Sequence, residues 1–274
     1  LEAVYGRERY DEDIEDNHRA VLQFAHVQDG DVLPVSGIGH ANTYGRHVYN
    51  KGADMVHTLR GMMGDTSFFA ACASFQQEYK FKDVTTEDMR QHFQLFTALS
   101  LSGFFNQWIK EAGFPHFDIL YTKEVGDKYE VRIKQTPRFN EIKYTNVVAK
   151  VTAFSADWQR HDVQVVLMNS QQSFVINCPF EPVYWSFDFD DLISDAVTTD
   201  WAVIADNTPI TMSQGMMKKI TANVSSGDSI LLRVEHHWAP ADGTYGAPTG
   251  AVISRQRYWT VDGIWEDDVQ ISSE

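Results

Sequence analysis

The chain has 274 residues, of which 43% are apolar, enough for one large domain or two to three small ones with packed cores. Its formal net charge is −15, with 38 Asp and Glu residues against 23 Lys and Arg residues. This charge disfavours binding to nucleic acid or to an anionic lipid surface. The longest apolar-rich run, residues 95–105, is shorter than the ~20 residues that a membrane-spanning helix needs. We therefore expect no nucleic-acid partner and no membrane span.

The first part of the chain, residues 1–115, carries the apolar spacing of amphipathic helices. The sequence Thr85-Thr86-Glu87-Asp88 is typical of a helix start, because a hydroxyl can accept a free amide and acids favour the positive helix end. Gly113 is expected to follow the last helix. The expected helices are residues 7 to about 28, 53–63, 65–79, one with an apolar face of Met89, Phe93, Phe96 and Leu99, and one holding Phe104, Phe105, Trp108 and Ile109.

After Pro115 the apolar period changes to two, which indicates β-strands. Strands expected at 130–134, 147–151, 163–167 and 174–176 lie about a dozen residues apart, the spacing of an antiparallel sandwich. A further β-rich region has strand candidates at 220–224, 230–235, 252–254 and 258–261. The predicted fold class is multidomain α+β. The predicted domains are a helical part (1–115), a β-sandwich (116–198) and a C-terminal β-rich region (199–274).

A glycine-containing loop, residues 29–46, separates the first two helices and leads into the sequence His47-Val48-Tyr49-Asn50-Lys51-Gly52-Ala53. A loop of this length inside a compact domain is usually functional. Taken alone, Tyr49 at the head of a helix would be explained as a half-buried aromatic side chain whose hydroxyl reaches water or a carbonyl.

The order of several motifs resembles M1-family zinc aminopeptidases, which are gluzincin metallopeptidases. These motifs are Tyr49-x-Lys51-Gly52-Ala53, Leu59-Arg60, Gly64-Asp65, the Phe68/Phe69 helix, the Thr-Thr-Glu-Asp cap and Trp108-x-x-x-x-Gly113-x-Pro115. The resemblance covers residues 1 to about 195. It implies the helical rear half of an M1 catalytic domain, followed by a β-sandwich.

The resemblance implies a role for Tyr49. In the family, zinc activates a water that attacks the scissile carbonyl, and a tyrosine hydroxyl stabilises the oxygen that gains negative charge. By its position in the motif this residue is Tyr49, and Tyr44 is the fallback candidate. Lys51 and Gly52 are interpreted as backbone and helix-start residues.

The family's zinc motif, His-Glu-x-x-His with a later Glu, does not occur in these residues. Residues 1–6 resemble the helix after the third zinc ligand, so the chain is expected to be a fragment that begins just after the metal motif. Zinc would belong to the parent protein and none to this chain, which alone should be inactive. The expected partners are a peptide substrate and the upstream part of the same protein. The alternative is a non-catalytic binding or scaffold protein with M1-like architecture, and the compartment is left open.

The ten histidines offer no clear substitute for the zinc motif. His236 and His237 are adjacent on an expected strand, so their side chains point to opposite faces and cannot easily share one ion. His40 and His47 flank Tyr44 and could line a substrate cleft, but solvated loop histidines are the favoured interpretation.

Three other residue groups have structural explanations. An acidic group that could suggest calcium lacks the EF-hand pattern and is expected to be a solvated turn. A group of aromatic residues could stack on carbohydrate but is expected to fill a core. Cys72 and Cys178 are expected to be buried free thiols. The acidic group is Asp188, Asp190, Asp191 and Asp195, and the aromatic group is Trp238, Tyr258, Trp259 and Trp265.

Overall fold

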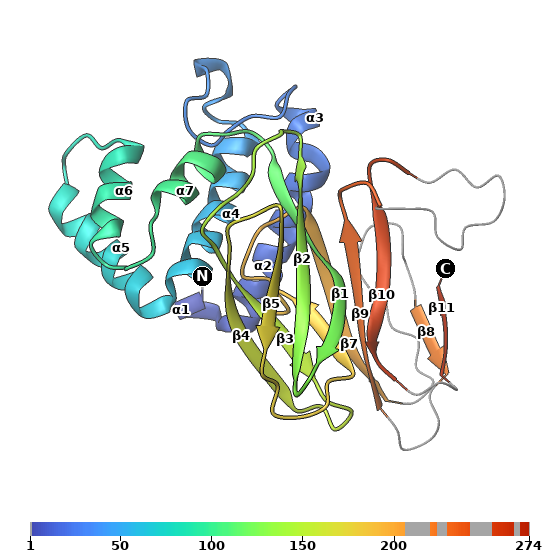
Figure 1. The fold of residues 1–274 in the computed structure, drawn as a ribbon. Helices are drawn as coiled ribbons and strands as arrows, with labels where there is room; N and C mark the ends of the chain where they lie inside the picture. Colours follow the sequence, from blue (N-terminus) through green and yellow to red (C-terminus); the bar gives the residue numbers. More distant parts are fainter. Residues whose placement is uncertain (1, 206–219, 224–228, 242–253, 266–268, 274) are drawn as a thin grey trace. The chain divides into compact units, whose positions relative to one another are not determined.

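The computed structural model describes residues 2–205, 220–223, 229–241, 254–265 and 269–273. Helices occupy the first part of the chain and strands the rest. In Figure 1, which is coloured from blue at the N-terminus to red at the C-terminus, the helices are blue to green and the strands green to red. The chain groups into two compact units. Unit 1 comprises residues 1–152, 162–177 and 186–195, and unit 2 comprises residues 153–161, 178–185 and 196–274. The predicted division into three domains at 115 and 198 stays a prediction.

The helices of unit 1 follow the expected order. A nearly continuous N-terminal helix is divided by a π-helical turn, as α2, η1 and α3, and a short 3₁₀ turn, η2, lies in the loop that follows. The elements are α1 (Glu2–Tyr5), α2 (Arg7–Ala20), η1 (Val21–Ala25), α3 (His26–Gln28), η2 (His40–Asn42), α4 (Arg46–Met63), α5 (Asp65–Tyr79), α6 (Thr86–Gln94), α7 (Ser102–Phe104) and the π-helical η3 (Phe105–Ile109).

Helix boundaries differ from the prediction in two places. The second long helix, α4, begins at Arg46 rather than near Ala53, so residues 47–52 already lie inside it. The capping sequence does form a complete capping box with Thr85 and Asp88, but α6 ends at Gln94, before Phe96 and Leu99. The Gln94 side chain explains this early end, because its amide donates to two later carbonyl groups and its oxygen accepts the Leu101 amide, which folds the chain into a turn.

The core of the helical part surrounds α4. This helix contacts α2, η1, α5 and η3, and its apolar side chains Met55, Leu59 and Met62 are buried. Each such side chain contributes about 1.5–3 kcal/mol by leaving water. The other buried apolar residues of this region are Val21, Leu22, Ala25, Phe68, Ala71, Phe93, Leu101, Phe104, Phe105 and Trp108. In the described part of the chain, no helix is long and apolar enough to cross a membrane.

The strands pair in four sheets. Their orders are β1-β2-β5, β4-β3-β6, β10-β9-β7 and β11-β8, and the first, third and fourth sheets are antiparallel. The strands are β1 (Phe114–Val125), β2 (Lys128–Arg138), β3 (Val147–Phe154), β4 (Arg160–Leu167), β5 (Gln171–Ile176), β6 (Tyr184–Phe187), β7 (Val197–Ala205), β8 (Ile220–Asn223), β9 (Ser229–His237), β10 (Tyr258–Ile264) and β11 (Gln270–Ser273). The helices and sheets confirm the α+β class.

Most expected strands lie within observed ones, but the expected strands included none at β1, β6, β7 or β11. In β1, residues 114–117 are all buried and the last five residues are all exposed, so the strand lacks the alternation that was sought. Gly113 enters β1 with φ +86°, and a Cβ there would lie 2.2 Å from the Arg138 carbonyl oxygen. The strand candidate at 252–253 and residue 224 lie outside the described residues.

The aromatic residues of unit 2 pack into a core, as predicted. Trp238 is buried, and the partly buried Trp259 and Trp265 pack against a cluster of buried aliphatic side chains. The His236 ring stacks on Trp259 with a centroid separation of 4.3 Å. The cluster consists of Ile204, Ile230, Leu232 and Val234. Cys72 and Cys178 are free, as predicted, but half-buried rather than buried.

Candidate functional site

Tyr49 lies in the first turn of α4, and its residue surface is 60% exposed. The fallback candidate Tyr44 ends the loop before the helix and is 85% exposed. The two rings stack, with centroids 6.4 Å apart and planes at 22°. The fold therefore brings both predicted tyrosines together on an exposed edge of unit 1, where a phenol hydroxyl can meet a ligand.

The carboxylate of Asp29, the first residue of the loop, binds the start of α4. Asp29 accepts hydrogen bonds from the backbone amides of Arg46 and His47, at 3.0 and 2.9 Å, and from His47 Nδ1 at 2.7 Å. His47 is 2% exposed, so the expectation of a solvated loop histidine is wrong for it, because its imidazole completes this buried contact. His40, in the loop, is exposed as expected.

Lys51 is a buried interior residue of α4, not a helix-start residue as predicted. The residue has no exposed surface. Its side chain reaches the loop before α4, where Nζ donates to the Leu33 carbonyl oxygen at 3.2 Å. The ammonium also lies 4.7 Å from the centre of the Phe114 ring. Burial lowers the pKa of Lys51 to about 7, although the charge of Asp54 opposes this shift.

The loop between Asp29 and α4 is fastened at further points. The backbone amides of Val35 and Ser36 both donate to the Ile109 carbonyl oxygen at 3.0 Å, and the Ser36 hydroxyl lies 3.0 Å from the Thr86 hydroxyl. Within residues 37–44, backbone hydrogen bonds form the η2 turn, and the Asn42 carbonyl oxygen accepts from the Gly45 amide. The middle of the loop is thus held by Ile109, and its last part carries the exposed Tyr44.

The middle of α4 holds a buried ion pair. Asp54 has no exposed surface and accepts from His18 Nδ1 at 3.0 Å, and His18 Nε2 donates to the Asp195 carbonyl oxygen at 2.7 Å. Since both ring nitrogens of His18 face acceptors, the imidazole satisfies both only when it is protonated. Burial alone would lower the pKa of His18, but the charge and hydrogen bond of Asp54 outweigh burial and raise it.

A second histidine of the helical part binds the same acidic segment. His57 Nε2 lies 2.8 Å from the Asp191 carbonyl oxygen, so this nitrogen donates, and Nδ1 accepts from the Tyr10 hydroxyl at 2.9 Å. Asp188 and Asp195 are each only 7% exposed. The prediction of a solvated turn for the acidic group is therefore wrong, because residues 188–195 pack against α4. Among the described residues, no group of three or more His, Cys, Asp or Glu side chains that could hold a metal ion is found.

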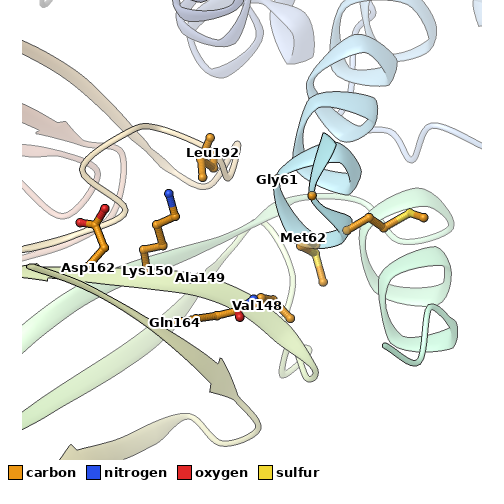
Figure 2. Close-up of a pocket in the computed structure, with 10 residues that line it drawn as sticks. Gly61, Met62, Val148, Ala149, Lys150, Asp162, Gln164 and Leu192 are labelled. Carbon is orange, nitrogen blue, oxygen red and sulfur yellow. The ribbon is translucent and has the colours of Figure 1, made fainter. Parts of the chain in front are cut away.

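A cavity of about 330 Å³ lies at the opposite end of α4 from Tyr49. Figure 2 shows Gly61 and Met62 on its helix side, and Lys150 and Asp162 on its strand side. Gly61 and Tyr49 are twelve positions apart in one helix, which corresponds to about 18 Å. This cavity is therefore not where the tyrosine hydroxyl could act.

The sequence predicted Tyr49 as a candidate site residue but gave no sign of the residues that contact the start of its helix. Asp29 stands before a glycine at a helix end and looks like an ordinary turn residue, so its contact with Arg46 and His47 had no local signal. The pairing of His18 with Asp54 also joins distant segments. Helical periodicity could have shown only that both lie on the buried face of their own helix.

Comparison with known proteins supports the family resemblance. Residues 18–108 match the model of the peptidase family M1 domain. Among solved structures, one similar chain is Legionella pneumophila aminopeptidase A in complex with aspartic acid, at 19% sequence identity and a TM-score of 0.45. That alignment spans 55% of this chain and 18% of the Legionella chain. No curated relative matches the sequence. The segment that matches the peptidase family M1 domain, residues 18–108, includes Tyr49, His47 and Asp29.

Proposed function

We propose that this chain is part of an M1-type zinc metallopeptidase, an aminopeptidase, in which Tyr49 donates a hydrogen bond during hydrolysis of a peptide bond. The observation that carries this proposal is the position of Tyr49. It lies inside the segment that matches the M1 peptidase model, in the first turn of a well-anchored helix, with an exposed ring.

The tyrosine hydroxyl suits an oxyanion-stabilising role. When a nucleophile attacks a peptide carbonyl, negative charge develops on the carbonyl oxygen. A neutral phenol hydroxyl that donates to this oxygen stabilises the charged intermediate more than the uncharged substrate, which lowers the barrier. The Tyr44 ring stacked on Tyr49 restricts the directions that the phenol can take.

The metal that the family implies does not fit the residues described here. No three His, Cys, Asp or Glu side chains in that part of the chain form a group that could hold a metal ion. We therefore propose that the metal ligands and the residues that recognise the peptide belong to another part of the protein, and we assign to this chain only the hydroxyl donor.

The test is Tyr49→Phe in a longer protein that includes the zinc motif. Turnover of an aminoacyl fluorogenic amide should fall about a hundred- to a thousandfold, because one oxyanion donor is lost. Zinc content should not change. Tyr5→Phe is the matched control, since Tyr5 is also exposed, at 68%. Unchanged turnover in Tyr49→Phe would remove this residue from the mechanism, and a large loss in Tyr44→Phe would transfer the role to the fallback candidate.

The 274-residue chain itself provides a second test. It should bind no stoichiometric zinc and should not cleave aminoacyl fluorogenic amides. Hydrolysis that a chelator abolishes would contradict the assignment of the metal ligands to another part of the protein. If the longer protein lacks the zinc motif or carries replaced ligands, the non-catalytic scaffold alternative is favoured instead.

A further inference from the structure

The helix that carries Tyr49 has no side-chain cap from its own N-cap residue. This residue is Gly45, which has no side chain to accept hydrogen bonds from the first amides of the helix, although these amides need acceptors. The Asp29 carboxylate fills this role from before the loop by accepting from the amides of Arg46 and His47. A negative group at the positive end of a helix adds electrostatic stabilisation.

His47 binds the Asp29 carboxylate through two of its nitrogen atoms. Its backbone amide and its ring nitrogen both bind Asp29 Oδ2, so one oxygen accepts two hydrogen bonds from the same residue. The side chains of His47 and Asp29 are only 2% and 7% exposed. Burial by itself would raise the pKa of Asp29, but the hydrogen bonds from His47 and Arg46 lower it. The carboxylate is therefore held ionised at the helix start.

Gly45 provides the space for this contact. Its φ of −80° is open to any residue, so backbone freedom does not require a glycine here. A Cβ at Gly45 would, however, lie 2.8 Å from the Cγ and both oxygens of Asp29. The Tyr49 amide donates to the Gly45 carbonyl oxygen at 3.2 Å, which links the capped residue directly to the tyrosine.

From these contacts we infer that Asp29, Gly45 and His47 form a positioning group that sets the direction of Tyr49. The Asp29 carboxylate fixes the first turn of α4. This turn fixes the Tyr49 backbone and the end of the loop that carries Tyr44, whose ring stacks on Tyr49. The functional part of this inference rests on the role proposed above for Tyr49, while the structural part can be tested without any activity.

The structural test uses the 274-residue chain labelled with 3-fluorotyrosine. The ¹⁹F resonance of Tyr49 is assigned by its loss in Tyr49→Phe. In Asp29→Ala this resonance should shift or broaden while that of Tyr5 stays in place. Asp29→Asn should move the resonance less than Asp29→Ala, because its one side-chain oxygen can still accept from Arg46 or His47, whereas the NH2 group that replaces the other oxygen cannot accept. Asp31→Ala is the matched control, since the exposed Asp31 binds the amide of its neighbour Val32 rather than the start of α4. An unmoved Tyr49 resonance in folded Asp29→Ala would overturn the inference.

A pair of glycine variants keeps the test decisive if Asp29→Ala does not fold. Gly45→Ala places a methyl group against the Asp29 carboxylate and should move the Tyr49 resonance. Gly39→Ala makes the same chemical change in the same loop, where a Cβ meets nothing within 4 Å, and should leave the resonance unchanged. Equal spectra for the two variants would contradict the positioning role.

The functional test is a double-mutant cycle in the longer protein with the zinc motif. Asp29→Ala should lower kcat about ten- to a hundredfold, as expected for a misplaced catalytic group, and Asp29→Asn should restore part of this loss, because only one of its two terminal atoms can accept. In the Tyr49→Phe background, Asp29→Ala should cause no further loss, because the group that it positions is already missing. Equal losses in both backgrounds would reduce Asp29 to a structural residue. If Tyr49→Phe leaves turnover unchanged, the proposed function fails, while the fluorine spectra still decide whether Asp29 positions the ring.

Discussion

The two ends of α4 differ in what holds them. At the N-terminal end, polar contacts from Asp29 fix the backbone, and the Tyr49 side chain is left exposed. At the C-terminal end, the helix packs closely against residue 192, and the Arg60 side chain is buried. At one end of the helix, the backbone amides are hydrogen-bonded and a side chain is exposed. At the other end, the backbone is closely packed and a side chain is buried. The open end is the one that suits chemistry, although the cavity lies at the other.

The largest change in the free energy of unfolding is expected for a substitution in the middle of α4, between the two ends. Asp54→Ala should lower the free energy of unfolding by about 3–5 kcal/mol, because it leaves the buried His18 without its charged partner. Urea denaturation followed by circular dichroism measures this loss. Asp16→Ala is the control, since Asp16 forms an exposed pair with Arg19 and should cost at most about 1 kcal/mol. Similar losses for the two variants would contradict a buried ion pair in α4.

The pH dependence of His18 sharpens this expectation. Its pKa in the folded protein is raised above the usual 6.5, so its contribution to stability is fully present below pH 6.5 and is lost as the pH rises through the folded pKa. The difference in free energy of unfolding between wild type and His18→Gln should therefore be larger at pH 5.5 than at pH 8.5. A difference that grows with pH would show that His18 is neutral in the fold.

A pair of glycine substitutions compares the two ends directly. In Gly61→Ala, the new Cβ would lie 2.5 Å from the Leu192 carbonyl oxygen, and overpacking should cost about 1–3 kcal/mol. In Gly52→Ala, the nearest atom is 3.7 Å away, on Val35, so the gain in helix propensity should stabilise the protein by up to about 1 kcal/mol. Thermal unfolding measures both variants. The same sign for both would erase the difference in packing between the two ends.

A pH-dependent effect is expected for the buried ammonium of Lys51 near the open end. The pKa of Lys51 is about 7 in the folded protein and 10.5 when unperturbed, so the unfolded state binds more protons between these values and stability rises with pH across that window. Lys51→Met removes this dependence. Its melting temperature should exceed that of the wild type most at pH 6, and the advantage should shrink towards pH 10. A constant difference would mean that Lys51 is not desolvated.

The sequence predicted the helical part better than the contacts that shape its site. The apolar spacing that includes Leu59 and Phe68 repeats over several turns, so it indicates helices regardless of what surrounds them. Strand β1 was missed, because its buried and exposed residues are grouped rather than alternating. The start of α4 was placed too late, because its cap comes from Asp29 rather than from a neighbour.

The candidate site follows the same division. Tyr49 could be proposed as a candidate because its motif is contiguous, and the motif predicts that it lies at a helix start. His18, Asp54 and Asp195 are separated by up to 177 positions, and no local pattern indicates which buried polar groups will meet. Such pairings depend on how the elements pack, and for this reason the solvated turn predicted at Asp188 was wrong.

The non-local cap also affects how the loop can vary. Because Asp29 joins the loop's two ends and Ile109 holds its middle, residues 37–44 can change in number without moving the start of α4. Doubling the length of a flexible loop costs only about 0.6 kcal/mol in closure entropy. Insertions in the segment beside Tyr49 are thus expected to change the surroundings of the tyrosine while its helix stays in register.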